Sequence, residues 1–242
     1  MLYKKFVSFL VLAVMALATT VTGFATTNKT TASDKEQRGV VTPVNLAILI
    51  QDDLVSQVGN ELGETRDFIR SLPPGSRVMV GYITTGTLQV RQPFTTDLDK
   101  AARSLRTVMG TTNASAFNPY VEVVEALRQF QTGNGKNVLL LISDGLDTSR
   151  GFDSSAAGNT LDLHRAIDNA RKRDVAVYTF FAPSVGLTSR SHLAVSYGQS
   201  SLNRLAHDTG GKAFFQGSSF VSFTPYFRRL REALNEQYAR AY

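Results

Sequence analysis

Short apolar runs without a polar residue are the feature that most restricts the fold of this chain. Leu46–Ile50 and Val138–Ile142 are runs of this kind, and Val175–Phe181 is nearly as apolar. Successive side chains of a strand point to opposite faces of its sheet, so a strand made only of apolar residues is buried on both faces. The runs therefore predict a mainly parallel sheet that is covered by helices on each side.

Helical periodicity fills most of the sequence between these runs. Apolar residues recur at Leu54, Val58, Leu62 and Ile69, a spacing typical of a helix with one buried face, and the pattern stops before Pro73. Strands that alternate with helices predict a doubly wound α/β fold. Further helices are expected at Asp97–Val108, Pro119–Phe130, Leu161–Arg173 and Ser201–Asp208, with a last helix whose apolar stripe holds Phe223, Phe227, Leu230, Leu234 and Tyr238.

Three more strands are predicted beside the apolar ones. Val78–Ile83 and Thr87–Arg91 are separated by the turn Thr84-Thr85-Gly86, and the alternating character of the second favours an antiparallel strand at the sheet edge. A short strand is expected at Ala213–Phe215. The predicted fold class is a doubly wound, mainly parallel sheet with one antiparallel edge strand and helices on both faces, as in Rossmann-like proteins.

Carboxylates follow two of the apolar strands. Asp52 and Asp53 come directly after Leu46–Ile50 and Gln51, and Asp144 follows Val138–Ile142 within Ser-Asp-Gly. In open α/β sheets, ligands bind beyond the carboxyl ends of the strands, at the point where the strand order reverses. If the order reverses between these two strands, the acids meet at one edge of the sheet, and we expect the functional site there.

The amino terminus has the pattern of a secretory signal. Lys4 and Lys5 precede the mostly apolar run Phe6–Leu17, and cleavage after Ala18 or after Ala25 fits the small residues that follow. We predict a signal peptide at residues 1–25 and therefore an exported protein, periplasmic or secreted. An uncleaved membrane anchor is the alternative, although the run is short for a span of about 20 residues.

The rest of the chain is predicted to form a leader and one domain. Residues 26–43 are polar and turn-prone, which indicates a flexible leader. Residues 44–242 are enough for a single domain with a substantial core, and they hold no second apolar segment long enough to cross a bilayer. Cysteine is absent from the sequence, which excludes disulfides, thiolate metal sites and cysteine nucleophiles.

Charge and motifs argue against nucleic-acid binding and catalysis. The formal net charge of +6 includes Lys4 and Lys5, and basic clusters such as Arg171-Lys172-Arg173 suit the end of a helix and are not interleaved with aromatic residues. "GNGKN" lacks the helix that a phosphate-binding loop needs. The three histidines do not have zinc-site spacing, and no Gly-x-Ser-x-Gly turn marks a hydrolase. We expect no enzymatic activity, with a small hydrolase as an alternative.

Several segments resemble the von Willebrand factor A (VWA) domain. They are "VLLLISDGLDTS", "LNRLAHDTGGKAFF", the acidic loop after the first strand, and the hairpin in "LPPGSRVMVGYITTGTLQV". The resemblance covers about Val44 to Tyr242 and is to divergent bacterial exported members. It implies the fold predicted above, a protein partner at the carboxyl edge of the sheet, and a metal-ion-dependent adhesion site for Mg²⁺.

That metal site, as the resemblance implies it, uses Asp-x-Ser-x-Ser after the first strand, a threonine from a middle loop and an aspartate after the fourth strand. Mg²⁺ needs near-octahedral oxygen ligands, and neither alignment of this sequence supplies the complete set. The two alignments place Asp52, Leu54 and Ser56, or Gln51, Asp53 and Val55, at the three motif positions. The middle loop offers Thr111, Thr112 or Ser115 for the threonine position. With Thr112, the first alignment gives the candidate metal ligands Asp52, Ser56, Thr112 and Asp144, a degenerate site.

Two hypotheses follow for the carboxyl edge. In the first, the domain binds a protein partner without a complete metal site, with Asp53 and Asp147 as candidate partner-binding residues and Gly151–Asn159 and Ser184–Gln199 as candidate recognition loops. In the second, the domain is a Mg²⁺-dependent adhesion module. A purely structural explanation of these acids is that they cap the following helix, for which Asp52 or Asp53 is well placed. The aromatic residues near the carboxyl end are expected to seat the last helix on the sheet.

Overall fold

The computed structural model describes residues 42–131, 135–151, 160–215 and 221–239. All of them belong to one compact unit, Val40–Tyr242. The predicted signal peptide and most of the predicted leader lie outside the described residues, as do residues 152–159 of one candidate recognition loop.

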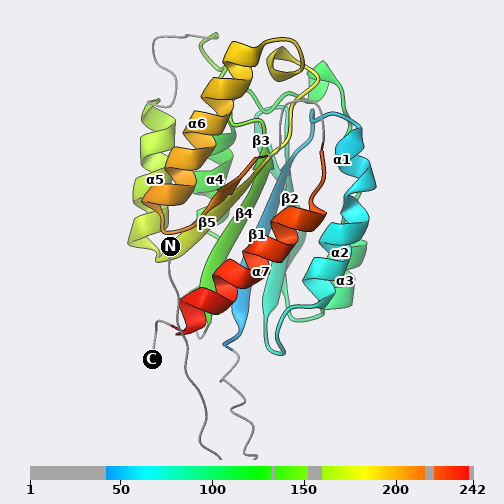
Figure 1. Ribbon diagram of the computed structural model, residues 1–242, viewed down its shortest axis with the longest axis vertical. Helices are drawn as coiled ribbons and strands as arrows, with labels where there is room; N and C mark the ends of the chain where they lie inside the picture. The colour runs from blue at the N-terminus through cyan, green and yellow to red at the C-terminus, as the bar shows by residue number, and fades with distance from the viewer. Residues whose placement is uncertain (1–41, 132–134, 152–159, 216–220, 240–242) are drawn as a thin grey trace, which may run out of the picture. The chain divides into compact units, whose positions relative to one another are not determined.

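The core of this unit is a six-stranded sheet with the order β3-β2-β1-β4-β5-β6 (Figure 1). Every neighbouring pair is parallel except β2 and β3, which are antiparallel. The sheet is therefore mainly parallel with one antiparallel edge strand, as predicted. The strands are β1 (Val44–Gln51), β2 (Arg77–Thr84), β3 (Thr87–Thr95), β4 (Lys136–Ser143), β5 (Val175–Phe181) and β6 (Ala213–Phe214).

The strand order reverses between β1 and β4, which lie side by side at the centre of the sheet. Their register pairs Leu46 with Val138 and Ile50 with Ile142, so the two strands end next to each other. This confirms the predicted juxtaposition of the two acidic turns. Both strands are apolar on each face because each face is covered.

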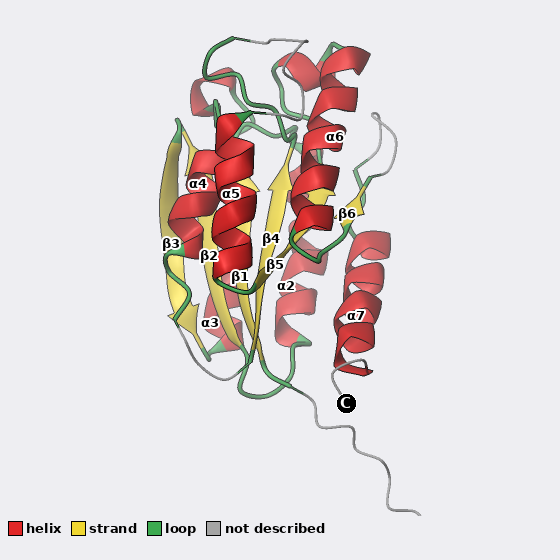
Figure 2. Ribbon diagram, turned by 90° about the vertical axis from the view of Figure 1, so that its left-hand side faces the viewer, coloured by secondary structure: helices red, strands yellow, loops and turns green. Residues whose placement is uncertain are grey.

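Helices cover the two faces of the sheet and divide the core into two layers (Figures 1 and 2). One layer packs the even-numbered residues of β1, such as Ile48, against α1, α2, α3 and α7. The other packs Leu49 and its neighbours against α4, α5 and α6. The helices are α1 (Gln57–Asn60), α2 (Leu62–Arg70), α3 (Leu98–Arg103), α4 (Pro119–Leu127), α5 (Leu161–Lys172), α6 (His192–Asp208) and α7 (Thr224–Ala239), with short 3₁₀ turns η1 (Thr112–Ala114) and η2 (Leu187–Ser189).

Side-chain caps explain where several helices begin. Asp97 accepts a hydrogen bond from the Lys100 amide at the start of α3, and Asn118 does the same for Tyr120 at the start of α4, where Pro119 occupies the first helical position. Ser191 caps α6 by accepting a hydrogen bond from Ala194 N. This cap places the start of α6 at His192, well before the predicted start.

Two predicted helix boundaries were wrong for a common reason. α3 ends at Arg103, and the residues up to Val108 form an irregular segment whose contacts are described below. α6 includes Val195 and Gly198, which the prediction places in the candidate recognition loop Ser184–Gln199, so the second half of that loop is helix. In both places, contacts with residues distant in the sequence determine where the helix begins or ends, and apolar periodicity gives no sign of such contacts.

The aromatic residues near the carboxyl end seat α7 on the sheet, as predicted. Phe180 of β5 lies within 5.5 Å, centroid to centroid, of four other rings. All five side chains are buried to at least nine tenths. The four rings around Phe180 belong to Phe214, Phe223, Tyr226 and Phe227.

The two edges of the sheet differ in length. β3 has nine residues and an irregular register against β2, and it carries Arg91 and Pro93. β6 has two residues, paired with Thr179 and Phe180 of β5. Charged residues, proline and irregular pairing are features that discourage an edge strand from accepting another strand.

Candidate functional site at the carboxyl edge

Three consecutive residues at the end of β1 point to different sides of the sheet. The Asp52 side chain lies on the side of Tyr82 and Arg106, whereas those of Gln51 and Asp53 are joined to each other and to the turn after β4. The alternation of side chains along β1 thus continues through the two residues that follow the strand. The carboxyl edge therefore contains two separate polar clusters.

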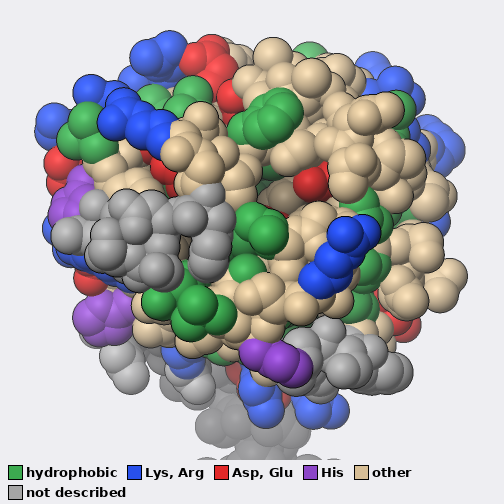
Figure 3. Space-filling view, turned by 90° about the horizontal axis from the view of Figure 1, so that it is seen from above, with side chains coloured by type: hydrophobic (Ala, Val, Ile, Leu, Met, Phe, Trp, Pro, Cys, Tyr) green, Lys and Arg blue, Asp and Glu red, His purple; other side chains and the backbone are tan. Residues whose placement is uncertain are grey.

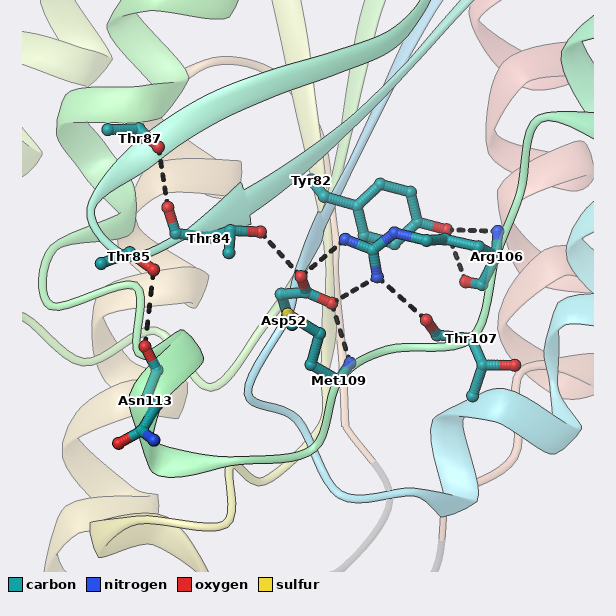
Figure 4. Close-up of polar contacts among 9 residues, drawn as sticks. All are labelled: Asp52, Tyr82, Thr84, Thr85, Thr87, Arg106, Thr107, Met109 and Asn113. Carbon is teal, nitrogen blue, oxygen red and sulfur yellow. Dashed lines mark hydrogen bonds and ion pairs between the residues drawn. The ribbon is translucent and has the colours of Figure 1, made fainter.

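The first cluster is an ion pair between Asp52 and Arg106 (Figure 4). The guanidinium binds the carboxylate in bidentate fashion, at 2.7 Å from Nη1 to Oδ1 and 2.6 Å from Nη2 to Oδ2. Thr84 Oγ1 donates to Oδ2 at 2.7 Å, and Met109 N donates to Oδ1 at 2.9 Å. The Asp52 side chain is fully buried, so protein donors surround the whole carboxylate.

Tyr82 holds Arg106 from the other side. The Arg106 guanidinium carbon lies 4.1 Å from the centre of the Tyr82 ring, a cation–π contact. The Tyr82 hydroxyl donates to Arg106 O at 2.6 Å and accepts from Arg106 N at 2.8 Å. Arg106, three residues after the end of α3, is thus held at both its backbone and its side chain.

The ion pair determines the ionisation of its members. Burial alone would raise the pKa of Asp52, but hydrogen bonds from Arg106, Thr84 and Met109 N outweigh it and hold the pKa below its ordinary value. The hydrogen bond to Asp52 raises the pKa of Arg106. Hydrogen bonding therefore favours the charged form of Asp52, whose counter-ion comes from its own chain.

The second cluster is organised by the Gln51 amide. Its Oε1 accepts from Ser143 Oγ at 2.6 Å and from Asp144 N at 3.3 Å, and its Nε2 donates to Asp53 Oδ1 at 2.8 Å. One neutral side chain thus ties the end of β1 to the turn after β4. Asp53 also has a hydrogen bond from the half-buried Ser115.

Asp144 is held by the turn that it starts and by the loop after β5. Its Oδ1 accepts from Leu146 N at 3.1 Å and its Oδ2 from Thr188 Oγ1 at 3.2 Å. Burial raises the pKa of Asp144. Burial, together with the nearby charge of Asp144, raises the pKa of Asp53 to about 6.

Helix α6 approaches the Asp144 turn at backbone distance. A Cβ atom on Gly198 would lie 1.9 Å from Asp144 O, and one on Gly145, where φ is +71°, would lie 2.5 Å from Gly198 O. Both positions therefore need glycine, and Gly145 also needs it for its left-handed backbone. This contact fixes α6 directly over the second cluster.

The structure does not bring the four candidate metal ligands together. Asp52 faces Arg106, and this corrects its expected role, because both of its oxygens are bound by protein donors. Ser56 and Thr112 have exposed side chains, and only Asp144 lies in the second cluster. The other alignment, from Gln51, places Asp53 beside Asp144, but its third position is Val55.

These residues do not fit a magnesium ion. The Gln51 carbonyl oxygen accepts two protein hydrogen bonds, and Val55 has no oxygen to offer. Within residues 42–131, 135–151, 160–215 and 221–239, no group of three or more His, Cys, Asp or Glu side chains is suited to hold a metal ion. The chemistry of the edge is therefore that of hydrogen-bonded acids and an internal ion pair.

The two candidate partner-binding acids have different surroundings. Asp53 is 4% exposed and points into the second cluster. Asp147 is half-buried and accepts hydrogen bonds from Asn118 Nδ2 at 3.1 Å and from Ser149 Oγ at 2.7 Å. Both acids form hydrogen bonds with other residues of the carboxyl edge. Their partner-binding role stays a prediction.

Apolar side chains are exposed around the two clusters. Met109, Phe117, Leu187 and Leu193 are 58%, 48%, 42% and 51% exposed. We call these four residues the apolar rim. Seen from above in Figure 3, hydrophobic side chains form separate patches around the middle of this edge, and most Lys and Arg side chains lie towards its periphery.

Sequence reasoning missed most members of the two clusters. Arg106 lay inside a predicted helix, and nothing local in the sequence links it to Asp52, 54 positions away. Thr84 and Thr188 have no motif of their own, whereas Ser115 belongs to the middle loop that the family motif singles out. Gln51 could have been identified, because it occupies the first motif position in the second alignment of the metal-site motif.

Comparison with known proteins bears on the fold. The sequence matches no protein-family profile and none of the curated proteins. The conserved hypothetical protein BatB from Bacteroides thetaiotaomicron superposes with a TM-score of 0.53 at 14% identity, over 82% of this chain and 99% of that one. A von Willebrand factor type A structure from Catenulispora acidiphila superposes with a TM-score of 0.51 at 17% identity, over 78% of this chain and 42% of that one.

The protein therefore has a von Willebrand factor A-like fold, as the sequence resemblance implied. At these identities the likeness concerns the fold alone. Among the described helices, none is both long and apolar enough to cross a membrane.

Proposed function

We propose that this domain is a protein-interaction module that binds a partner protein at the carboxyl edge of its sheet, without a divalent ion. The observation that carries the proposal is the apolar rim. Met109 and Phe117 come from the segment between α3 and α4, Leu187 comes from η2, and Leu193 comes from the first turn of α6. Their separate exposed patches surround one edge of the sheet, where a partner protein that spans the edge would cover them together.

The backbone at Phe117 supports this reading. Phe117 has a φ of +53°, which is unfavourable for a residue with a bulky side chain. Thr148 holds it there, since its N and Oγ1 donate to Phe117 O at 2.6 and 3.2 Å. Strain of this kind tends to occur at functional sites, and here it holds an aromatic side chain half out of the surface.

The hydrogen bonding of the acids favours binding over catalysis. Asp52 is neutralised by Arg106, and Asp53 and Asp144 are bound by amide and hydroxyl donors of the protein. A general acid or base has to reach a substrate proton, and these carboxyl groups are buried. With the predicted signal peptide, we place the interaction outside the cytoplasm.

Site-specific photo-crosslinking tests the proposal. A photoreactive phenylalanine analogue at position 117 or 187 is expected to capture the same partner in cells that make this protein. The matched control is Val90, an exposed apolar residue on β3 (39% exposed) away from the rim. Equal capture from Val90, or no capture from either rim position, contradicts the proposal.

A competition variant sharpens this test. Phe117→Asn removes the aromatic side chain but keeps a residue that tolerates positive φ. We expect this variant to stay folded and to compete poorly with the wild-type protein for the partner. Undiminished competition would exclude Phe117 from the contact.

A further inference from the structure

Residues 104–118, which connect α3 to α4, contribute Met109 and Phe117 to the apolar rim. We call this segment the rim loop. It contains the short turn η1 and is otherwise irregular, so it has few hydrogen bonds of its own to fix its course. Its position depends on contacts with the end of β1 and with β2.

Four of the hydrogen bonds that hold this segment meet at Asp52. The side-chain oxygens of Asp52 accept from Arg106 and from Met109 N, and its backbone oxygen accepts from Gly110 N at 2.9 Å. Met109 therefore has its amide fixed to the same carboxylate oxygen that Arg106 binds, while its side chain is 58% exposed. The place of a rim side chain is coupled directly to the ion pair.

We propose that Arg106 is a positioning residue whose guanidinium serves as the built-in cation of the carboxyl edge. It neutralises Asp52 and thereby holds Met109 and the rim loop ready for the partner, so no divalent ion is needed there. The inference rests on the proposed function for the partner, but the state of the loop can be measured without any partner.

Arginine is suited to this task in a way that lysine is not. The guanidinium places two donors on two carboxylate oxygens at once, has a third contact to Thr107 O at 2.9 Å, and stacks on Tyr82. A lysine ammonium keeps the charge but lacks the planar fork. Without either group, Asp52 would be a buried carboxylate facing only Thr84 and the Met109 amide.

The test compares Arg106→Ala and Arg106→Lys with a matched control, Arg66→Ala, in the full chain. Arg66 also reaches the start of the rim loop, through a 3.1 Å hydrogen bond from Nη2 to Leu105 O, but it does not contact Asp52. The first readout is amide hydrogen exchange at Met109 and Gly110. We expect about 10- to 100-fold faster exchange in Arg106→Ala, a smaller change in Arg106→Lys, and little change in Arg66→Ala.

Two further readouts separate positioning from general stability. Crosslinking from position 109 should fall in Arg106→Ala while crosslinking from Leu187, on the other side of the rim, persists. Millimolar methylguanidinium should restore slow exchange at Met109 in Arg106→Ala, whereas Mg²⁺ should not. If Arg106→Ala does not fold, the same measurements are made on Arg106→Lys.

The outcomes are distinct. Wild-type exchange at Met109 and Gly110 in folded Arg106→Ala overturns the inference, and so does restoration by Mg²⁺. Loss of crosslinking at positions 109 and 187 alike would mean a merely structural role, which also overturns it. If the wild-type protein captures no partner, the proposed function fails, and hydrogen exchange still decides whether Arg106 holds the loop.

Discussion

Asp52 and Asp53 are neighbours in the chain, yet their carboxyl groups have opposite electrostatic surroundings. Asp52 accepts hydrogen bonds from a guanidinium and its pKa is lowered, whereas Asp53 is buried beside a second carboxyl group and its pKa is raised to about 6. The strand alternation that sends the two side chains to opposite faces of the sheet is the cause. Each residue therefore gives its own prediction.

Replacing Asp52 by asparagine should strongly destabilise the protein. The change leaves Arg106 without its charged partner in a site where the Asp52 side chain is fully buried, and breaking a buried pair costs about 3 kcal/mol. Urea unfolding measures the loss. The matched control is Asp67→Asn, whose exposed pair with Arg70 is expected to contribute under about 1 kcal/mol. Equal effects of the two variants would contradict the role of the ion pair.

The raised pKa of Asp53 predicts a pH dependence of stability. Between its ordinary pKa of 3.8 and its folded pKa of about 6, folded Asp53 retains a proton that the unfolded chain has lost. Stability should therefore fall as pH rises through this window and level off above it, by up to about 3 kcal/mol. The pKa of Asp144, which burial also raises, acts in the same direction.

Asp53→Asn checks this dependence. The variant should be more stable than the wild type near neutral pH, and its unfolding free energy should decline less between about pH 4 and pH 6. The control is Asp168→Asn, an exposed aspartate on α5. An unchanged pH profile in Asp53→Asn would contradict the burial of a titrating group at this position.

At the scale of elements, the sequence predicted those whose form is dictated by their own residues. β1 and β4 were predicted because a wholly apolar strand has to be buried on both faces, and α5 because its periodicity is strong. The start of α6 was missed because Gly198 and the small polar residues around it weaken the apolar pattern. The backbone contact between Gly198 and Asp144 that requires them lies outside any local signal.

That contact gives a prediction for α6. Gly198→Ala would place a methyl group 1.9 Å from Asp144 O, and the helix would have to move off the second cluster, at a cost of about 3 kcal/mol. Gly63→Ala in α2 is the matched control, since nothing lies within 4 Å of its added methyl group and alanine favours a helix by about 1 kcal/mol. Thermal unfolding of both variants should show opposite signs. A tolerated Gly198→Ala would mean that α6 does not pack as described.

For the whole molecule, we predict that stability does not respond to divalent ions. An ion bound at 100 times its dissociation constant would add about 2.7 kcal/mol, or roughly 5–10 °C in melting temperature for a domain of this size. Calorimetric melting with millimolar Mg²⁺ and with a chelator should give the same temperature. A rise with Mg²⁺ that Asp144→Ala abolishes would support a metal-dependent adhesion site instead.

The juxtaposition of the two acidic turns was predictable from the sequence, but the hydrogen-bond partners of the acids were not. Acids after two apolar strands, in a fold whose order reverses between them, were enough to locate the carboxyl edge. Which acid faces which partner depends on Arg106 and Thr84, residues far from Asp52 in the chain. A family motif cannot predict these contacts, because Arg106 and Thr84 lie outside the motif.

The unequal edge strands of the sheet bear on how copies of this protein could associate. In an open head-to-tail assembly, one edge strand of each copy pairs with the opposite edge strand of the next copy. Here β3 has nine residues and the described part of β6 has two. Association of β3 of one copy with the described part of β6 of the next would pair only two residues of β6, so we expect no fibre built by that contact.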